Sequence, residues 1–414
     1  MADRTIHTAV RMAGRDPHED GRAATPLELL FDLTFVIAFG TASNELAHFL
    51  AEDDVREGVI GFLFATFAVS WAWINFSWFA SAYDTDDWIF RLTTMVQMVG
   101  VLVLALGLSD MFESLLEGQH VDNRVMVLGY VVMRVPMLLQ WKRAERQDVA
   151  RRTTCRIMFV SVLLSQAGWV VLLLLDLRIG PMFAGAFLLV LVELAGPVLA
   201  ESRGSGTPWH PHHIAERYGL LVIIALGEGL LGTMASLSAI VGTEGPGWSL
   251  EVAVLGFAGT AMTFGMWWSY FTVPSGAILH AHRERSFGWG YGHIPFFGAT
   301  VGVGAGLHAA AYRLEHHSEL GPVATVLTVA VPLGVYVLIL FALYAQLSHT
   351  MDPFHLWLVA GSVAVLAASV GLAAAGVSMP WCLLVLAFTP WVTVLGYELV
   401  GHRHNDEVLA GLTA

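Results

Sequence analysis

Several ionisable side chains lie inside long apolar stretches of this 414-residue sequence, and these are the residues whose types and spacing could do chemistry. Glu28 and Asp32 are four residues apart, so on a helix their carboxylates share one face. Two carboxylates held close together at low dielectric resist joint ionisation, and one of them can bind a proton near neutral pH. Alternatively, Glu28 belongs to the start of a helix, where the helix dipole favours an anion.

A second group opens the apolar segment 214–241. Glu216 and Arg217 begin this segment, and Glu228 follows Arg217 by nearly three helical turns. The two side chains therefore lie on one stripe about 16 Å apart. They are too distant to touch, but both could face the same polar pathway.

Arg134 lies in the middle of another apolar segment, before Val135 and Pro136. A charge at the centre of a membrane helix is costly, so such an arginine needs a carboxylate partner. The candidates are Glu28, Asp32 and Glu193. The alternative to a polar pathway is a static ion pair that only locks helices together.

The remaining polar candidates are weaker. Glu193 and Glu398 lie near the ends of their segments, where we expect them to snorkel to the headgroups. His48 follows Glu45 by three residues and could pair with it. His293 and His308 share one segment, where a hydrogen-bonded neutral histidine is the commoner case, although histidine also suits a proton relay.

Three further histidine groups invite a metal interpretation, because imidazole binds zinc, copper and nickel. Their spacing matches no compact metal motif and no cysteine accompanies them, so we expect solvated histidines, no metal site and no cofactor. The groups are His210, His212 and His213; His280 and His282; and His402 and His404.

The composition defines the elements that must position these residues. The chain is 56% hydrophobic and 13% charged, against roughly 45–50% and 25% in soluble domains. Its apolar blocks are about 20 residues long, enough to cross a bilayer. A secreted domain, a disordered chain and a sizeable soluble enzyme domain are excluded, and the net charge of −13 argues against nucleic acid.

We therefore predict an all-α polytopic membrane protein with about twelve transmembrane helices. The predicted spans are 27–50, 58–82, 89–108, 123–141, 157–175, 179–200, 214–241, 249–272, 293–313, 322–345, 354–375 and 378–400. Sixteen Lys and Arg residues, from Arg4 to Arg403, fall on the side of the N-terminus and four on the other, which predicts both termini inside. Tryptophans of the second span, Trp71, Trp73 and Trp78, are expected to face lipid or the membrane interface.

Short matches recur in the same order in the two halves of the chain, which predicts two six-helix repeats. The matching segments are 35–40 with 222–227, 99–101 with 301–303 and 193–196 with 398–401, together with Trp73 and Trp268. The predicted organisation is a cytoplasmic segment 1–24, a first repeat 25–200, a cytoplasmic linker 201–213, a second repeat 214–400 and a cytoplasmic tail 401–414.

Two strings carry a family resemblance. TPLELLFDLTFVIAF (Thr25 to Phe39) and HHIAERYGLLVIIALGE (His212 to Glu228) resemble the signatures of the bacterial low-temperature-requirement A family, as does Tyr291 to His293. Leu30 departs from the family pattern, as does the absence of a Gly-Gly pair around Pro332. The resemblance implies a multi-pass protein of the bacterial cytoplasmic (inner) membrane linked to growth in the cold, and it implies no substrate.

Three functions follow from these residues. The leading hypothesis is a proton-linked transporter of a small solute, with Asp32, Arg134 and Glu228 near the pathway and the bilayer and a small solute or ion as partners. The first alternative is an ion channel whose constriction is formed by Phe35, Ile37, Ile223 and Leu226, on the spans 27–50 and 214–241. The second is a membrane-embedded sensor or a structural protein. No nucleophile–base pair occurs at helical spacing, so we expect no enzyme and no catalytic residues.

Overall fold

The computed structural model describes residues 9–241, 249–349 and 352–413, and its described residues form helices and no strand. Residues 1–8, which include Arg4, and residue 414 belong to the predicted terminal segments and lie outside the described residues. The helices are α1 (Pro26–Ala51), α2 (Val55–Tyr83), α3 (Trp88–Leu106), α4 (Leu108–Glu117), α5 (Arg124–Gln147), α6 (Arg152–Leu174), α7 (Ile179–Arg203), α8 (Pro211–Val241), α9 (Leu250–Phe271), α10 (Ser275–Ala281), the 3₁₀ turn η1 (Arg283–Arg285), α11 (Ser286–Leu314), α12 (Pro322–Ser348), α13 (Pro353–Ala374), α14 (Met379–Gly396), the π-helical turn η2 (Tyr397–Gly401) and α15 (His402–Thr413).

Twelve helical segments of the described chain are long and apolar enough to cross a membrane. This finding confirms the predicted all-α class and the number of spans. Four of the twelve join neighbouring elements: α3 with α4, α9 with α10, η1 with α11, and α14 with η2 and the start of α15. The division into two six-helix repeats stays a prediction.

Helix α11 begins earlier than the predicted start of its span at residue 293. Glycines and proline are poor helix formers, which favours a late start. The structure begins α11 at Ser286 instead, because tertiary packing uses the glycines. A Cβ at Gly288 would lie 2.5 Å from Gln346 Nε2, and one at Gly292 would lie 2.6 Å from Leu343 Cδ2. These glycines therefore let α12 pack close to α11.

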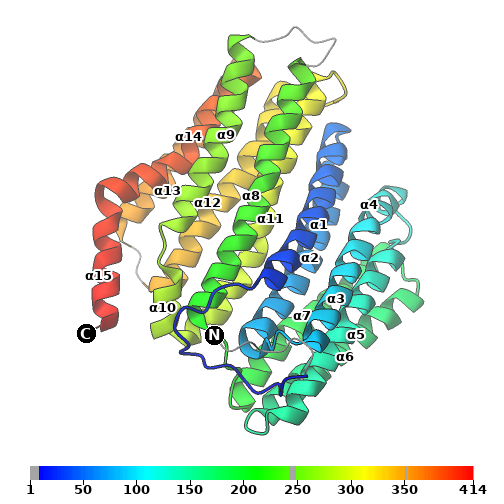
Figure 1. The fold of residues 1–414 in the computed structure, drawn as a ribbon. Helices are drawn as coiled ribbons and strands as arrows, with labels where there is room; N and C mark the ends of the chain where they lie inside the picture. The colour runs from blue at the N-terminus through cyan, green and yellow to red at the C-terminus, as the bar shows by residue number, and fades with distance from the viewer. Residues whose placement is uncertain (1–8, 242–248, 350–351, 414) are drawn as a thin grey trace. The chain divides into compact units, whose positions relative to one another are not determined.

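The chain divides into two compact units. Unit 1 comprises the residues up to Thr41 together with Ala68–Arg217, and in it α3 packs on α5, α5 on α6 and α6 on α7 (Figure 1). Unit 2 comprises Ala42–Phe67 and the residues from Tyr218 onward, and in it α11 packs on α12, α12 on α13, α13 on α14 and α14 on α9 (Figure 1).

Small residues place α11 at the centre of unit 2. In its apolar window 89% of the residues are buried, against 17% in α13, so α13 is the helix with most surface left for lipid. A Cβ at Gly304 would lie 2.6 Å from the backbone carbonyl carbon of Glu228, and one at Gly306 would lie 2.3 Å from the Thr328 carbonyl oxygen. The backbones of α8 and α12 thus contact α11 directly, as small residues allow in membrane helices.

A buried ionic cluster as candidate functional site

Four ionisable side chains from α1 and α8 meet inside unit 1. Glu28 and Asp32 are four residues apart on α1, and His213 and Arg217 are four residues apart on α8, so each pair shares one helix face. Arg217 Nη2 donates to Asp32 Oδ1 at 2.5 Å, and Arg217 Nη1 lies 3.2 Å from Glu28 Oε1. His213 Nε2 also lies 3.2 Å from Glu28 Oε1, and all four side chains are buried. We call these four residues the ionic cluster.

Side chains of α2 complete the cluster. Trp73 Nε1 donates to Asp32 Oδ1 at 2.7 Å, and the Arg217 guanidinium carbon lies 5.6 Å from the centre of the Trp73 ring, within cation–π range. Arg217 Nη2 also donates to Ser77 Oγ at 3.2 Å, one turn further along α2. The expectation that Trp73 faces lipid is therefore wrong, because its indole N–H has a buried carboxylate as acceptor.

Trp71 is likewise buried, at 2% exposure, so the same expectation is wrong for it. His213 was expected to be a solvated loop histidine, and this expectation is also wrong. It lies in the first turns of α8, where its backbone N–H donates to His210 Nδ1 at 3.2 Å. The only signal for its burial is the His213–Arg217 spacing, which repeats that of the two acids.

Glu28 combines both of its predicted roles. Thr25 N donates to Glu28 Oε2 at 2.8 Å, and Glu28 N donates to Thr25 Oγ1 at 3.3 Å, which together form a capping box at the start of α1. The other oxygen, Oε1, is the one closest to Arg217. The same carboxylate therefore begins the helix and takes part in the ionic cluster.

A second ion pair lies where the chain enters α1. Arg22 Nη2 lies 3.7 Å from Asp84 Oδ2, and both side chains are nearly inaccessible. Burial raises the pKa of Asp84 to about 6, and the negative charge of Glu28 adds to the rise while Arg22 opposes it. Glu216 is exposed, and its Oε2 accepts from Ala24 N at 3.3 Å, so it holds the segment before α1.

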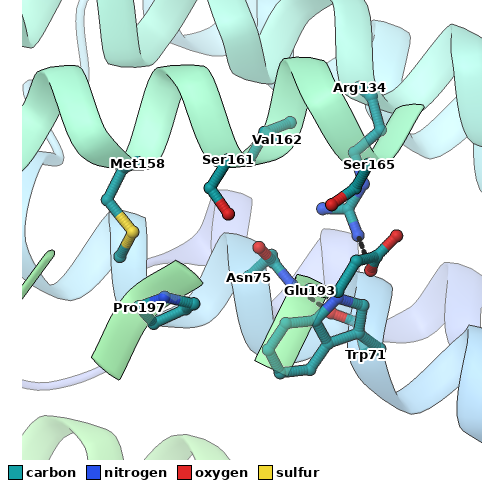
Figure 2. Close-up of a pocket in the computed structure, with 9 residues that line it drawn as sticks. All are labelled: Trp71, Asn75, Arg134, Met158, Ser161, Val162, Ser165, Glu193 and Pro197. Atoms are coloured by element: carbon teal, nitrogen blue, oxygen red, sulfur yellow. Dashed lines mark hydrogen bonds and ion pairs between the residues drawn. The ribbon is translucent and has the colours of Figure 1, made fainter. Parts of the chain in front are cut away.

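Arg134 is placed against Glu193, one of its three candidate partners (Figure 2). Arg134 Nη2 lies 3.6 Å from Glu193 Oε2, and Trp169 Nε1 donates to Glu193 Oε1 at 2.7 Å. The pair lines a cavity of about 10 Å³, the smallest space that holds one water molecule. Glu193 is 6% exposed, so the expectation that it snorkels is wrong; its partner Arg134 keeps it inside. Arg134 and Asp32 thus have separate ion-pair partners.

Glu398 and the pair around His48 lie at the surface. Glu398 is exposed and accepts from Trp268 Nε1 at 3.1 Å. His48 Nε2 lies 3.6 Å from Glu52 Oε1, and both side chains are about half exposed, while Glu45 is half-buried. These residues have the surroundings of interfacial side chains.

His293 in unit 2 is a core histidine with both ring nitrogens in use. Nδ1 lies 2.7 Å from the Trp289 carbonyl oxygen, which can only accept, so Nδ1 carries the hydrogen. Nε2 is then the acceptor for the Tyr270 hydroxyl at 3.0 Å. This arrangement fits a neutral, structural imidazole.

Glu228 and His308 lie along one crossing of α8 and α11 in unit 2. Glu228 is 2% exposed, and no basic side chain of the described residues lies within ion-pair distance of it. A Cβ at Gly232, one turn after Glu228, would lie 2.9 Å from His308 Cδ2, which places His308 beside α8 there. His308 Nε2 is buried and makes no hydrogen bond to a described residue. Glu228 and His308, two side chains that can each bind a proton, therefore lie about one helical turn apart.

These features define a polytopic α-helical membrane protein with ionisable groups buried in its spans. The chain belongs to the family described as bacterial low temperature requirement A protein (LtrA), which matches residues 23–389. The match confirms the resemblance drawn from the strings in α1 and α8. The chain is also similar to the uncharacterized protein RA0937 of Rhizobium meliloti (strain 1021), with 26% identity over 322 residues that cover 74% of this chain and 73% of the relative. No solved structure matches the chain.

Proposed function

We propose that this protein is a proton-linked transporter of a small solute, with no enzymatic activity, in which buried carboxylates bind the coupling proton. The observation that supports the proposal most strongly is the composition of the ionic cluster. Glu28 and Asp32 share one permanent cation, Arg217, and His213 is the fourth member. Ionisable groups kept inside membrane spans commonly mark ion pathways and proton relays.

The charge balance of the ionic cluster leaves room for one proton. Two carboxylates and one guanidinium sum to a single negative charge, which is costly in a medium of low dielectric. Asp32 Oδ2 is buried and has no hydrogen-bond partner among the described residues, and the same holds for His213 Nδ1. One proton on either group makes the ionic cluster neutral, so its uptake and release can be coupled to a change of conformation.

Glu228 and His308 supply a second proton-binding element. Glu228 has no cationic partner within the described chain, so it must be neutral or face water to avoid the cost of a buried charge. The free His308 Nε2 beside the same helix crossing is a suitable proton acceptor. We propose that Glu228, His308 and the ionic cluster bind the coupling proton. The Arg134–Glu193 ion pair only locks helices together.

The proposed channel constriction is less well supported. Phe35 is fully buried, whereas Ile37 is 53% exposed, because residues two apart on a helix point to different sides. Ile223 is 47% exposed and Leu226 is 5% exposed. The four side chains do not share one environment, so we do not put the channel forward.

Proteoliposomes with pyranine in the lumen test the transporter. Sugars, amino acids and monovalent cations are added one class at a time, and lumenal pH is followed. At least one class should drive proton movement in the wild type, and Glu228→Gln and Asp32→Asn should abolish it. Glu117→Gln removes an exposed carboxylate at the end of α4 and should leave the movement unchanged. Proton movement that survives both buried substitutions, or that no solute class elicits, would refute the proposal.

We further propose that both termini lie in the cytoplasm and that the membrane is the bacterial inner membrane. The excess of basic residues on the N-terminal side supports this orientation. Fusions of a periplasm-active phosphatase to the loop between α1 and α2 should be active, and fusions to the C-terminus inactive. The reverse pattern would contradict the orientation.

A further inference from the structure

Three side chains with metal-binding atoms gather at the start of α13 in unit 2. Asp352 precedes the helix, His355 lies in its first turn and His404 comes from α15. One ligand atom from each of the three lies within 4.8 Å of the others. Asp352 Oδ1 lies 2.8 Å from His355 Nδ1, and Asp352 Oδ2 lies 3.1 Å from His404 Nδ1. The carboxylate thus bridges two imidazoles that are far apart in the sequence.

The hydrogen bonds of these residues leave one of the imidazoles unsatisfied. Asp352 Oδ1 caps α13 by accepting from His355 N at 3.0 Å. His404 Nδ1 is buried and makes no hydrogen bond to a described residue, although it lies beside the carboxylate. A buried ring nitrogen that lies close to a carboxylate oxygen without a hydrogen bond to it is an atom that a shared metal ion would satisfy.

Aromatic rings pack against the two imidazoles, and a cavity lies beside His355. The Tyr344 ring stacks on His355 with centroids 4.8 Å apart, and the Phe354 ring lies 6.0 Å from that of His404. His355 also lines a cavity of about 40 Å³, which has room for water. The imidazoles are therefore held in place by packing, and a water ligand has space beside His355.

We propose that Asp352, His355 and His404 bind a divalent transition metal, with Zn²⁺ as the best match. Two imidazoles and one carboxylate with a water in the fourth position are an accepted zinc ligand set. Zinc bonds of roughly 2.0–2.1 Å in a tetrahedron separate neighbouring ligand atoms by roughly 3.3 Å. His355 Nδ1 lies 2.8 Å from Asp352 Oδ1 and His404 Nδ1 lies 3.1 Å from Asp352 Oδ2, so each imidazole has one carboxylate oxygen at about this spacing. Ca²⁺ and Mg²⁺ prefer oxygen ligands and fit less well.

The bound ion would join the start of α13 to α15. The polypeptide already holds α15 at this place, because Asn405 Nδ2 donates to the Thr272 carbonyl at the end of α9 at 2.8 Å. A metal ion would bind Asp352 and His355 at the start of α13 together with His404 of α15. We infer that the ion fixes the C-terminal helix to unit 2.

The test is zinc titration by calorimetry of the full chain in detergent, after chelator treatment and purification through a tag without histidine. Absorption of the Co²⁺-substituted protein reports on the ligands. We expect one ion whose affinity falls at least about 100-fold in His355→Ala and in His404→Ala, since changes beyond the direct ligands alone cost 10–100-fold. Both variants should also lose the Co²⁺ bands and the zinc-dependent rise in melting temperature.

Two further variants separate metal binding from structure. Asp352→Asn keeps an oxygen that can cap α13 but removes the charge, so zinc affinity should fall while the metal-free melting temperature is unchanged. His402→Ala is the matched control on α15, because His402 Nδ1 lies 3.2 Å from the Tyr397 carbonyl and outside the site, and it should bind zinc normally. Equal zinc binding by the wild type and all three site variants would overturn the proposal, as would a loss in His402→Ala as large as that in His404→Ala.

Discussion

Replacing Arg217 by methionine removes the only permanent cation of the ionic cluster and keeps the volume of the side chain. Glu28 and Asp32 then face each other with no guanidinium between them, although Arg217 lies 3.2 Å and 2.5 Å from them in the wild type. Breaking a buried ion pair by removing one partner typically costs about 3–5 kcal/mol. Because Arg217 is fully buried and serves two carboxylates, we expect Arg217→Met to lie in the upper half of that range.

The triple variant Glu28→Gln, Asp32→Asn, Arg217→Met supplies the decisive comparison. Replacing a whole buried ionic group by well-packed hydrophobic residues of similar volume is often neutral or stabilising. The Gln and Asn of this variant keep a carbonyl oxygen that can accept from Thr25 N and from Trp73 Nε1. The triple variant should therefore recover most of the stability that Arg217→Met loses, through a strongly non-additive coupling of residues in contact.

The assay is equilibrium unfolding in mixed detergent micelles, with the free energy of unfolding measured at one pH. Arg203→Met, at an exposed position at the end of α7, is the control and should change this free energy by less than about 0.5 kcal/mol. A loss below about 1 kcal/mol in Arg217→Met, or a triple variant less stable than the single variant, would refute the charge-balance reasoning.

Three further predictions concern stability. Burial raises the pKa of Asp84 from 3.8 to about 6, so its protonated carboxyl stabilises the folded state below pH 4, and this stabilisation is lost as the pH rises through 6. Between pH 4 and 7, the free energy of unfolding of the wild type should therefore fall relative to that of Asp84→Asn by on the order of 3 kcal/mol. Parallel pH profiles of the two proteins would contradict this prediction. Gly304→Ala places a Cβ 2.6 Å from the α8 backbone and should destabilise by about 1–3 kcal/mol in the same unfolding assay, whereas Gly227→Ala meets no atom within 4 Å and should show no loss. Glu193→Gln leaves Arg134 buried without its carboxylate and should lower the free energy of unfolding by about 3–5 kcal/mol, and adding Arg134→Met should restore much of it; no recovery would show that the pair is not coupled.

The spans could be predicted because burial in a bilayer needs only length and apolar composition, both of which are local. The shared face of Glu28 and Asp32 was predictable for the same reason, since helical periodicity is a local property. The capping box at Thr25 and Glu28 could also have been recognised from its spacing.

The partners of these residues could not be predicted, because they come from helices that are distant in the sequence. Nothing near Trp73 indicates that its indole would donate to Asp32, and the tryptophan alone favours a membrane interface. His404 shows the same limit, since its sequence neighbour is His402 whereas its spatial neighbours are Asp352 and His355. Pairing between helices depends on packing, and the sequence of either helix alone does not encode it.

The two oxygens of Glu28 connect the segment before α1 to Arg217 of the ionic cluster. One oxygen holds Thr25, and the residues before it are fastened in turn by Arg22 to Asp84 and by Ala24 to Glu216. The segment before α1 is thus tied to the ionic cluster through Glu28, and several of residues 16–21 are exposed. Spectroscopic labels on the exposed positions among residues 16–21 would therefore report on changes at a carboxylate that is fully buried in this structure.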